Sequence, residues 1–138
     1  MRILFLDFDG VVHPGPDVAT SLTHFCWLPI LTRLTAGVDD VRLVVHSTWR
    51  HQYHLSELRE MLGSLNSRIL DVTTGPGRWD SIERWVCANR STVVSFRVLD
   101  DELDEFPDPP PSELIICRPD TGVSEVRVQA LLRTWLGE

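Results

Sequence analysis

The sequence predicts an α/β fold: a three-layer, Rossmann-like arrangement of about five parallel strands with helices on both faces. Two observations lead to this prediction. Short apolar runs alternate along the chain with segments whose apolar residues recur at helical spacing, as is typical of βαβ units. Acidic or hydroxyl residues directly follow three of the apolar runs, as expected where parallel strands end at one polar edge.

Five short apolar runs are predicted to be strands, since each is bounded by polar or turn-forming residues. The first ends in acidic residues and a glycine, the second in a polar cluster, and the fourth in a pair of aspartates. The third is the weakest pattern, and the fifth follows an acidic, proline-rich stretch (102–111) that is expected to be a surface loop. In chain order the runs are residues 2–8, 41–46, 68–72, 92–99 and 113–117.

Helices are expected between these runs. Pro29 suits the first turn of a helix that stops at Gly37, and Gly63 closes a second helix. The loop TTGPG leads into a third, and Ser124 is expected to cap a fourth. The apolar residues at helical spacing are Ile30, Leu31 and Leu34, then Leu55, Leu58 and Leu62, then Trp79, Ile82, Trp85 and Val86, and finally Val128, Leu131, Leu132 and Trp135.

Composition narrows the class of protein. A chain of 138 residues fits one domain, expected to span residues 1–138. The formal net charge of −7 argues against a whole-surface electrostatic grip on nucleic acid, although it leaves room for a local basic patch. No apolar run is long enough to span a membrane. Three cysteines without CxxC spacing indicate free thiols and a cytoplasmic location.

The polar residues that follow the predicted strands are candidates for a functional site. Because the carboxyl ends of parallel strands meet at one edge, we expect them to lie together. Each signal has an ordinary alternative: an Asp-x-Asp turn, a serine cap and a solvated aspartate pair. Their coincidence at one edge favours a site. The residues are Asp7, Asp9 and Gly10 after the first strand, Ser47 and Thr48 after the second, and Asp100 and Asp101 after the fourth.

The chemistry of this edge points to phosphoryl transfer. Asp7 and Asp9 repel each other unless a cation holds them. These residues and Asp100 are hard oxygen ligands without a histidine or cysteine at metal spacing, which favours Mg²⁺ over Zn²⁺. A carboxylate beside such an ion can attack phosphorus to form an acyl phosphate. A second carboxylate can protonate the leaving oxygen and then activate water.

Three segments resemble motifs of haloacid dehalogenase-like (HAD) phosphohydrolases. FLDFDGVV resembles the first motif, VVHST the second and VLDD the fourth, in the order of the family. The resemblance implies that Asp7 is the nucleophile and Asp9 the acid/base, with the Asp9 backbone carbonyl also on the metal. It implies that Ser47 binds phosphate and that Asp100 completes the magnesium site, with Asp101 as the alternative ligand. It also implies a sheet with strand order 5-4-1-2-3.

The third motif departs from the family pattern. The family usually supplies a lysine near the start of the helix before the fourth strand, but all 13 basic residues of this chain are arginines. Arg78, in GPGRWD, lies where that lysine is expected; the alternative is a solvated arginine at the start of a helix. A guanidinium keeps the charge but is planar and broader than an ammonium.

The spacing of the motifs leaves no room for a cap domain. In the family, capless members often act on large substrates or borrow a lid from a partner, so a homodimer that covers the site is left open. WR after the second motif and RWDSIERW around the third resemble a branch of HAD domains found in RNA-repair proteins. The expected substrate is therefore a phosphorylated small molecule, a nucleotide or a nucleic-acid end.

Residues next to the motifs are candidates for substrate contact. Trp49 can stack on a base and Arg50 can contact phosphate. The alternatives are core packing for Trp49 and a surface ion pair for Arg50. The full set of substrate-binding candidates is Gly10, His13, Thr48, Trp49 and Arg50, with His51 and His54 on the same rim.

Other functions fit part of this pattern. A response-regulator receiver shares the parallel sheet, the aspartates and magnesium, but it needs a lysine after its last strand and a phosphoacceptor on its third, where this chain offers only Asp71. A catalytically weak or inactive binding module is disfavoured by the presence of both Asp7 and Asp9 and favoured by the missing lysine. Transfer of phosphate to an alcohol instead of water is a further alternative.

Overall fold

A single parallel sheet forms the centre of the molecule. The computed structural model describes residues 1–138, and its five strands lie in the order β3-β2-β1-β4-β5. Every neighbouring pair is parallel. The predicted fold class and the predicted strand order are both confirmed. The strands are β1 (Arg2–Leu6), β2 (Val41–Val45), β3 (Ile69–Val72), β4 (Ser95–Asp100) and β5 (Leu114–Ile116).

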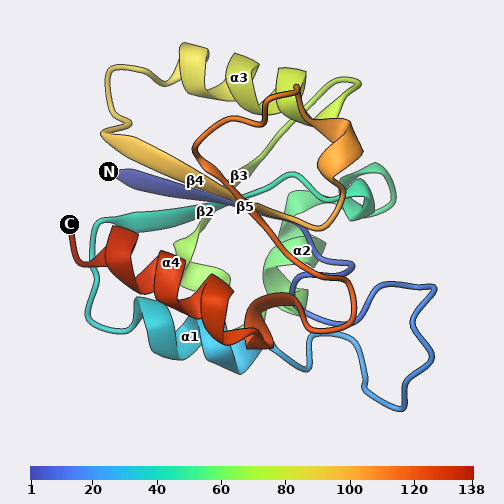
Figure 1. Ribbon diagram of the computed structural model, residues 1–138. Helices are drawn as coiled ribbons and strands as arrows, with labels where there is room; N and C mark the ends of the chain where they lie inside the picture. The colour runs from blue at the N-terminus through green and yellow to red at the C-terminus, as the bar shows by residue number, and fades with distance from the viewer.

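Helices cover both faces of the sheet (Figure 1). Helices α1 (Leu28–Thr35), α2 (Leu55–Met61) and α4 (Val126–Leu136) pack on one face, and α3 (Arg78–Ala88) packs on the other. No second domain is inserted between the strands, and no helix is long and apolar enough to cross a membrane. Four short 3₁₀ helices complete the chain: η1 (Thr48–His51), η2 (Gly63–Arg68), η3 (Leu103–Glu105) and η4 (Gly122–Ser124).

The buried strand β1 divides the core in two. Because successive side chains of a strand point to opposite faces, Leu4 and Leu6 pack with the residues of α1 and α4. Ile3 and Phe5 pack on the other side with residues of α3. All four are at most 1% exposed, and burial of each such side chain contributes about 1.5–3 kcal/mol. The central strand is therefore fixed from both faces.

Some predicted boundaries differ from the structure. Strand β4 begins at Ser95, not Thr92, and ends on Asp100. The prediction that Ser124 caps the last helix is wrong: the N-cap is Glu125, without a side-chain cap bond. Ser124 instead ends η4, and its hydroxyl donates to the Thr121 carbonyl. In the acidic loop, Phe106 is buried against the α3 side of the core.

The register of the sheet determines which residues meet at its carboxyl edge. Leu6 at the end of β1 stands between Val45 of β2 and Leu99 of β4. Parallel pairing continues past this point, since the His46 backbone N–H donates to the Leu6 carbonyl and the Asp7 backbone N–H donates to the Leu99 carbonyl. The next residues along the three strands therefore form one row: His46, Asp7 and Asp100.

Candidate active site

Three aspartates form a cluster at the carboxyl edge of the sheet. Asp7, Asp100 and Asp101 each place a carboxylate oxygen within 4.8 Å of the others. Asp7 is 2% exposed and Asp100 is fully buried, while Asp101 is half-buried. Burial of several carboxylates together is costly unless positive charge or hydrogen-bond donors compensate them. The neighbours of the cluster therefore determine its chemistry.

Arg78 is the cation that faces this cluster. It lies at the start of α3, directly after Gly77, whose φ of +78° turns the loop into the helix. Its Nη1 is 3.1 Å from Asp7 Oδ2 and 2.8 Å from both carboxylate oxygens of Asp100. Its Nη2 points elsewhere and is 3.8 Å from Glu102. A single nitrogen thus makes every contact with the buried aspartates.

The charges of the cluster shift its acidities in opposite directions. Burial, with the nearby Asp100 carboxylate, raises the pKa of Asp7 well above its usual value, against the opposing effect of Arg78. Burial and Asp100 raise the pKa of Asp101 to about 6. Burial also acts to raise the pKa of Asp100, but the hydrogen bond from His46 and the charges around it hold that pKa below the usual value. The cluster therefore places three carboxyl groups beside the single guanidinium of Arg78.

His46 is a site residue that the sequence reasoning missed. It is 1% exposed, and its Nε2 lies 2.8 Å from Asp100 Oδ2. Burial lowers its pKa despite that contact, so a neutral imidazole donates to the carboxylate, and the buried Nδ1 has no partner. The register of β1, β2 and β4 reveals it only in the folded chain, where His46 occupies the same row as Asp7 and Asp100.

The Asp9 carboxylate lies apart from the cluster. Its Oδ1 is 2.8 Å from His13 Nε2, and its Oδ2 accepts a hydrogen bond of 3.1 Å from Trp49 Nε1. His13 is 1% exposed, so the structure places it beneath Asp9 and not on the open rim. Trp49 is half-buried, and its ring packs edge-on against Phe8 and Phe25.

Some of the residues after β2 contact the protein, and others are exposed. Ser47 is fully buried, and its hydroxyl accepts the Trp49 backbone N–H, whereas Thr48 is exposed. Arg50 donates to the Thr73 hydroxyl and, at 2.8 Å, to the Gly75 carbonyl. Arg50 thus holds the loop that leads to Arg78. His51 and His54 are exposed, and a contact of any of these residues with substrate stays a prediction.

Gly10 permits the close approach of Asp101. Its φ is +76°, and a Cβ at this position would stand 2.2 Å from Asp101 Oδ2. Any side chain here would be strained and would displace the carboxylate. The glycine after Asp9 therefore allows Asp101 to join the cluster, since the turn after β1 passes directly over it.

The cluster fits a divalent metal ion. It offers three carboxylates and no sulfur ligand, the donor set of a hard cation. Burial, together with the nearby Asp100 carboxylate, raises the pKa values of Asp7 and Asp101, and a bound cation would oppose this effect. The carboxyl edge is therefore able to hold a metal through these aspartates.

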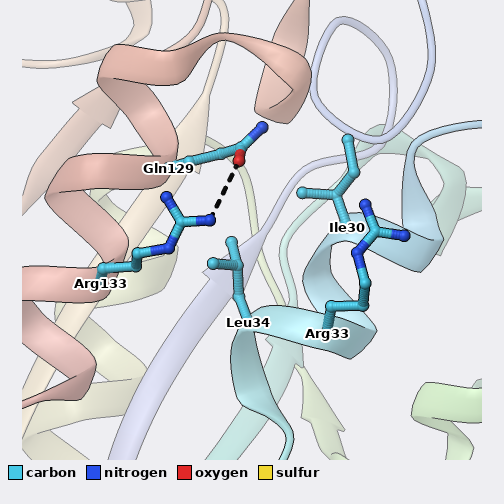
Figure 2. Close-up of a pocket in the computed structure, with 5 residues that line it drawn as sticks. All are labelled: Ile30, Arg33, Leu34, Gln129 and Arg133. Atoms are coloured by element: carbon cyan, nitrogen blue, oxygen red, sulfur yellow. Dashed lines mark hydrogen bonds between the residues drawn. The ribbon is translucent and has the colours of Figure 1, made fainter.

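Two cavities help to locate the open surfaces. One of about 300 Å³ lies between α1 and α4 (Figure 2), where Arg133 donates to Gln129; it includes none of the aspartates and is lined by Ile30, Arg33, Leu34, Gln129 and Arg133. A second of about 230 Å³ adjoins the site through Arg78. Its other walls are aromatic and acidic: Trp79, Asp80, Asp104, Glu105 and Phe106, with Gly77 and Pro107.

Comparison with known families agrees with this geometry. A family model described as the HAD domain in Swiss Army Knife RNA repair proteins matches residues 3–128. No curated protein and no solved structure matches the chain. The matched region includes every strand residue except Arg2 and every residue of the aspartate cluster. The chain therefore belongs to the family of HAD domains of Swiss Army Knife RNA repair proteins.

Proposed function

We propose that this domain is a magnesium-dependent phosphatase that hydrolyses a phosphomonoester, on a nucleotide or a nucleic-acid end, through an aspartyl-phosphate on Asp7. The observation that most supports it is the cluster of Asp7, Asp100 and Asp101, in which a single nitrogen of Arg78 contacts the two buried aspartates, Asp7 and Asp100. This arrangement combines a nucleophile with a place for a cation and a fixed positive charge, the parts that phosphoryl transfer requires.

The reaction has two steps. In the first, a carboxylate oxygen of Asp7 attacks phosphorus, the bond from phosphorus to the leaving oxygen breaks, and Asp9 gives that oxygen a proton. In the second, Asp9 takes a proton from water, the water oxygen attacks phosphorus, and the bond to Asp7 breaks. Inorganic phosphate leaves, and both aspartates return to their starting states.

The metal site would use Asp7, Asp101 and the Asp9 backbone carbonyl, with Asp100 close by. Asp100 already accepts hydrogen bonds from His46, Arg78 and the Glu102 backbone N–H, which leaves Asp101 the freer carboxylate. A bound Mg²⁺ supplies positive charge to the phosphoryl oxygens. Arg78 fixes the orientation of Asp7 and Asp100, and Ser47 is the proposed phosphate-binding hydroxyl.

The family supports a nucleic-acid end as the substrate class. The site lies at an open edge without an inserted cap, where a large substrate can approach. The net charge of −7 disfavours long contact with a nucleic-acid backbone. A terminal phosphate that enters the site alone is compatible with both facts.

The test is release of inorganic phosphate with and without Mg²⁺. We expect Asp7→Asn to lower kcat/KM by about 10³-fold or more on every substrate, since it removes the nucleophile. Asp9→Asn should do so on nucleotides and oligonucleotides, whose leaving oxygen needs a proton. Asp17→Asn makes the same chemical change in an exposed loop and is the control. Substrates would include an aryl phosphate, nucleoside monophosphates and oligonucleotides with a 5′ or 3′ phosphate.

Each result separates the alternatives. Turnover that persists in Asp7→Asn would rule out the aspartyl-phosphate. A folded, metal-binding protein without turnover on any of these substrates would favour a binding module. Added alcohol that captures phosphate as a new ester would identify a phosphotransferase.

A further inference from the structure

We propose that His13 and Trp49 are positioning residues that hold the Asp9 carboxyl group in one orientation for proton transfer to the leaving group. The inference rests on the proposed function and adds two residues that do not touch the reacting atoms. The sequence predicted that His13 and Trp49 contact substrate, and the inference gives them a role in the mechanism instead.

The two N–H donors each contact one carboxylate oxygen of Asp9. His13 Nε2 lies 2.8 Å from Oδ1, and Trp49 Nε1 lies 3.1 Å from Oδ2. The Phe25 backbone N–H donates to His13 Nδ1 at 3.1 Å. Because Nδ1 accepts this bond, it carries no hydrogen, and the ring proton of the neutral imidazole must be on Nε2. His13 is therefore a fixed donor to Asp9.

Both donors are themselves held in place. His13 is 1% exposed, and its backbone carbonyl accepts the Gly10 N–H at 2.9 Å. The ring of Trp49 lies 5.4 Å from that of Phe8 and 5.6 Å from that of His13. The backbone N–H of Trp49 donates to Ser47. Two segments of chain, one carrying His13 and the other Trp49, thus converge on one carboxyl group.

These two hydrogen bonds hold the Asp9 side chain apart from the other carboxylates. The side chain of Asp9 is not part of the cluster of Asp7, Asp100 and Asp101. It is about one-third exposed, so a leaving oxygen can reach it. Each of its oxygens keeps a free lone pair after accepting one hydrogen bond. The arrangement reserves this carboxyl group for proton transfer.

Leaving-group dependence tests the role. Proton donation is important when the leaving oxygen is a poor leaving group, as in an alkyl phosphate or a nucleotide, and much less so for nitrophenyl phosphate. We expect Trp49→Phe and His13→Ala to lower kcat/KM about 10²-fold on alkyl phosphates and less than about threefold on nitrophenyl phosphate. His13→Gln, which can place an N–H near Oδ1, should recover most of the loss.

A matched control exists elsewhere in the chain. Trp85 Nε1 donates to Asp71 at 2.8 Å, so Trp85→Phe removes the same type of bond away from Asp9. We expect it to leave the leaving-group dependence unchanged.

Equal losses on every substrate, or no loss in Trp49→Phe, would overturn the inference while leaving an Asp7-dependent phosphatase intact. Activity that survives Asp7→Asn would overturn the proposed function and the inference together.

Discussion

A buried charged residue lies at each end of strand β1, and the arginine contacts at the two ends differ. At the amino end, Arg2 is 8% exposed. Its Nε and Nη2 each donate to Asp40 at 2.8 Å, and its Nη1 donates to the carbonyls of Trp135 and Leu136. Every nitrogen of this guanidinium has a hydrogen-bond partner, and its positive charge lies beside the carbonyls of the last turn of α4.

At the carboxyl end, one nitrogen of Arg78 serves two buried aspartates, with Asp101 beside them. The acidities reflect the difference. The hydrogen bond from Arg2 holds the pKa of Asp40 below its usual value, whereas burial raises the pKa of Asp7 well above it. At the amino end, the charge and the N–H donors of Arg2 are matched by acceptors, as in a structural contact. The carboxyl end groups three carboxyl groups about one arginine, and a bound cation would offset their charge.

The largest effect is expected from loss of the Arg78 charge. Arg78→Met leaves Asp7 and Asp100 without their cation, and we expect kcat/KM to fall about 10³-fold. Arg78→Lys should stay within about tenfold of wild type, because one nitrogen makes all the aspartate contacts and an ammonium can take its place. Phosphate-release kinetics would measure both. An equal loss in the two variants would mean that the second guanidinium nitrogen is required.

Loss of the Arg2 contacts should affect stability and not activity. Arg2→Met leaves the carbonyls of Trp135 and Leu136 without their donor, and we expect the free energy of unfolding to fall by about 1–3 kcal/mol. Urea denaturation would measure it, with Arg90→Met at an exposed position as the control. A fall in kcat of the folded variant would show that the two ends of β1 are coupled.

A change in stability of similar size is expected when metal binds. At 100 times the dissociation constant, Mg²⁺ should raise the free energy of unfolding by about 2.7 kcal/mol, and thermal denaturation would show it as a higher Tm. Asp7→Asn and Asp101→Asn should remove this increment because each deletes a carboxylate of the cluster. Arg2→Met should keep it. An increment that survives in Asp7→Asn would place the metal elsewhere.

Much of the fold was predictable because the strands are short apolar runs and the motifs occur in the order of the family. The edge that carries Asp7, Ser47 and Asp100 followed from the rule that parallel strands end together. The start of α4 did not, since Ser124 looks like a helix cap but belongs to a 3₁₀ turn. A local pattern cannot distinguish a serine before a helix from one inside a tight turn.

The partners of the site residues were less predictable. The bond between Trp49 and Asp9 joins residues 40 positions apart, and only the folded chain brings them together. His46 was missed because a histidine at the end of an apolar run resembles the start of a polar turn. Its contact with Asp100 depends on pairing across β1, which the sequence pattern does not display.

The single-nitrogen contact of Arg78 also has a consequence at the level of the gene. Lysine and arginine codons can differ by a single base, so one point mutation can exchange the two residues. Where both arms of a guanidinium are engaged, such a change breaks the site. Here the second arm lies 3.8 Å from Glu102, so we expect such an exchange to keep the contacts with Asp7 and Asp100.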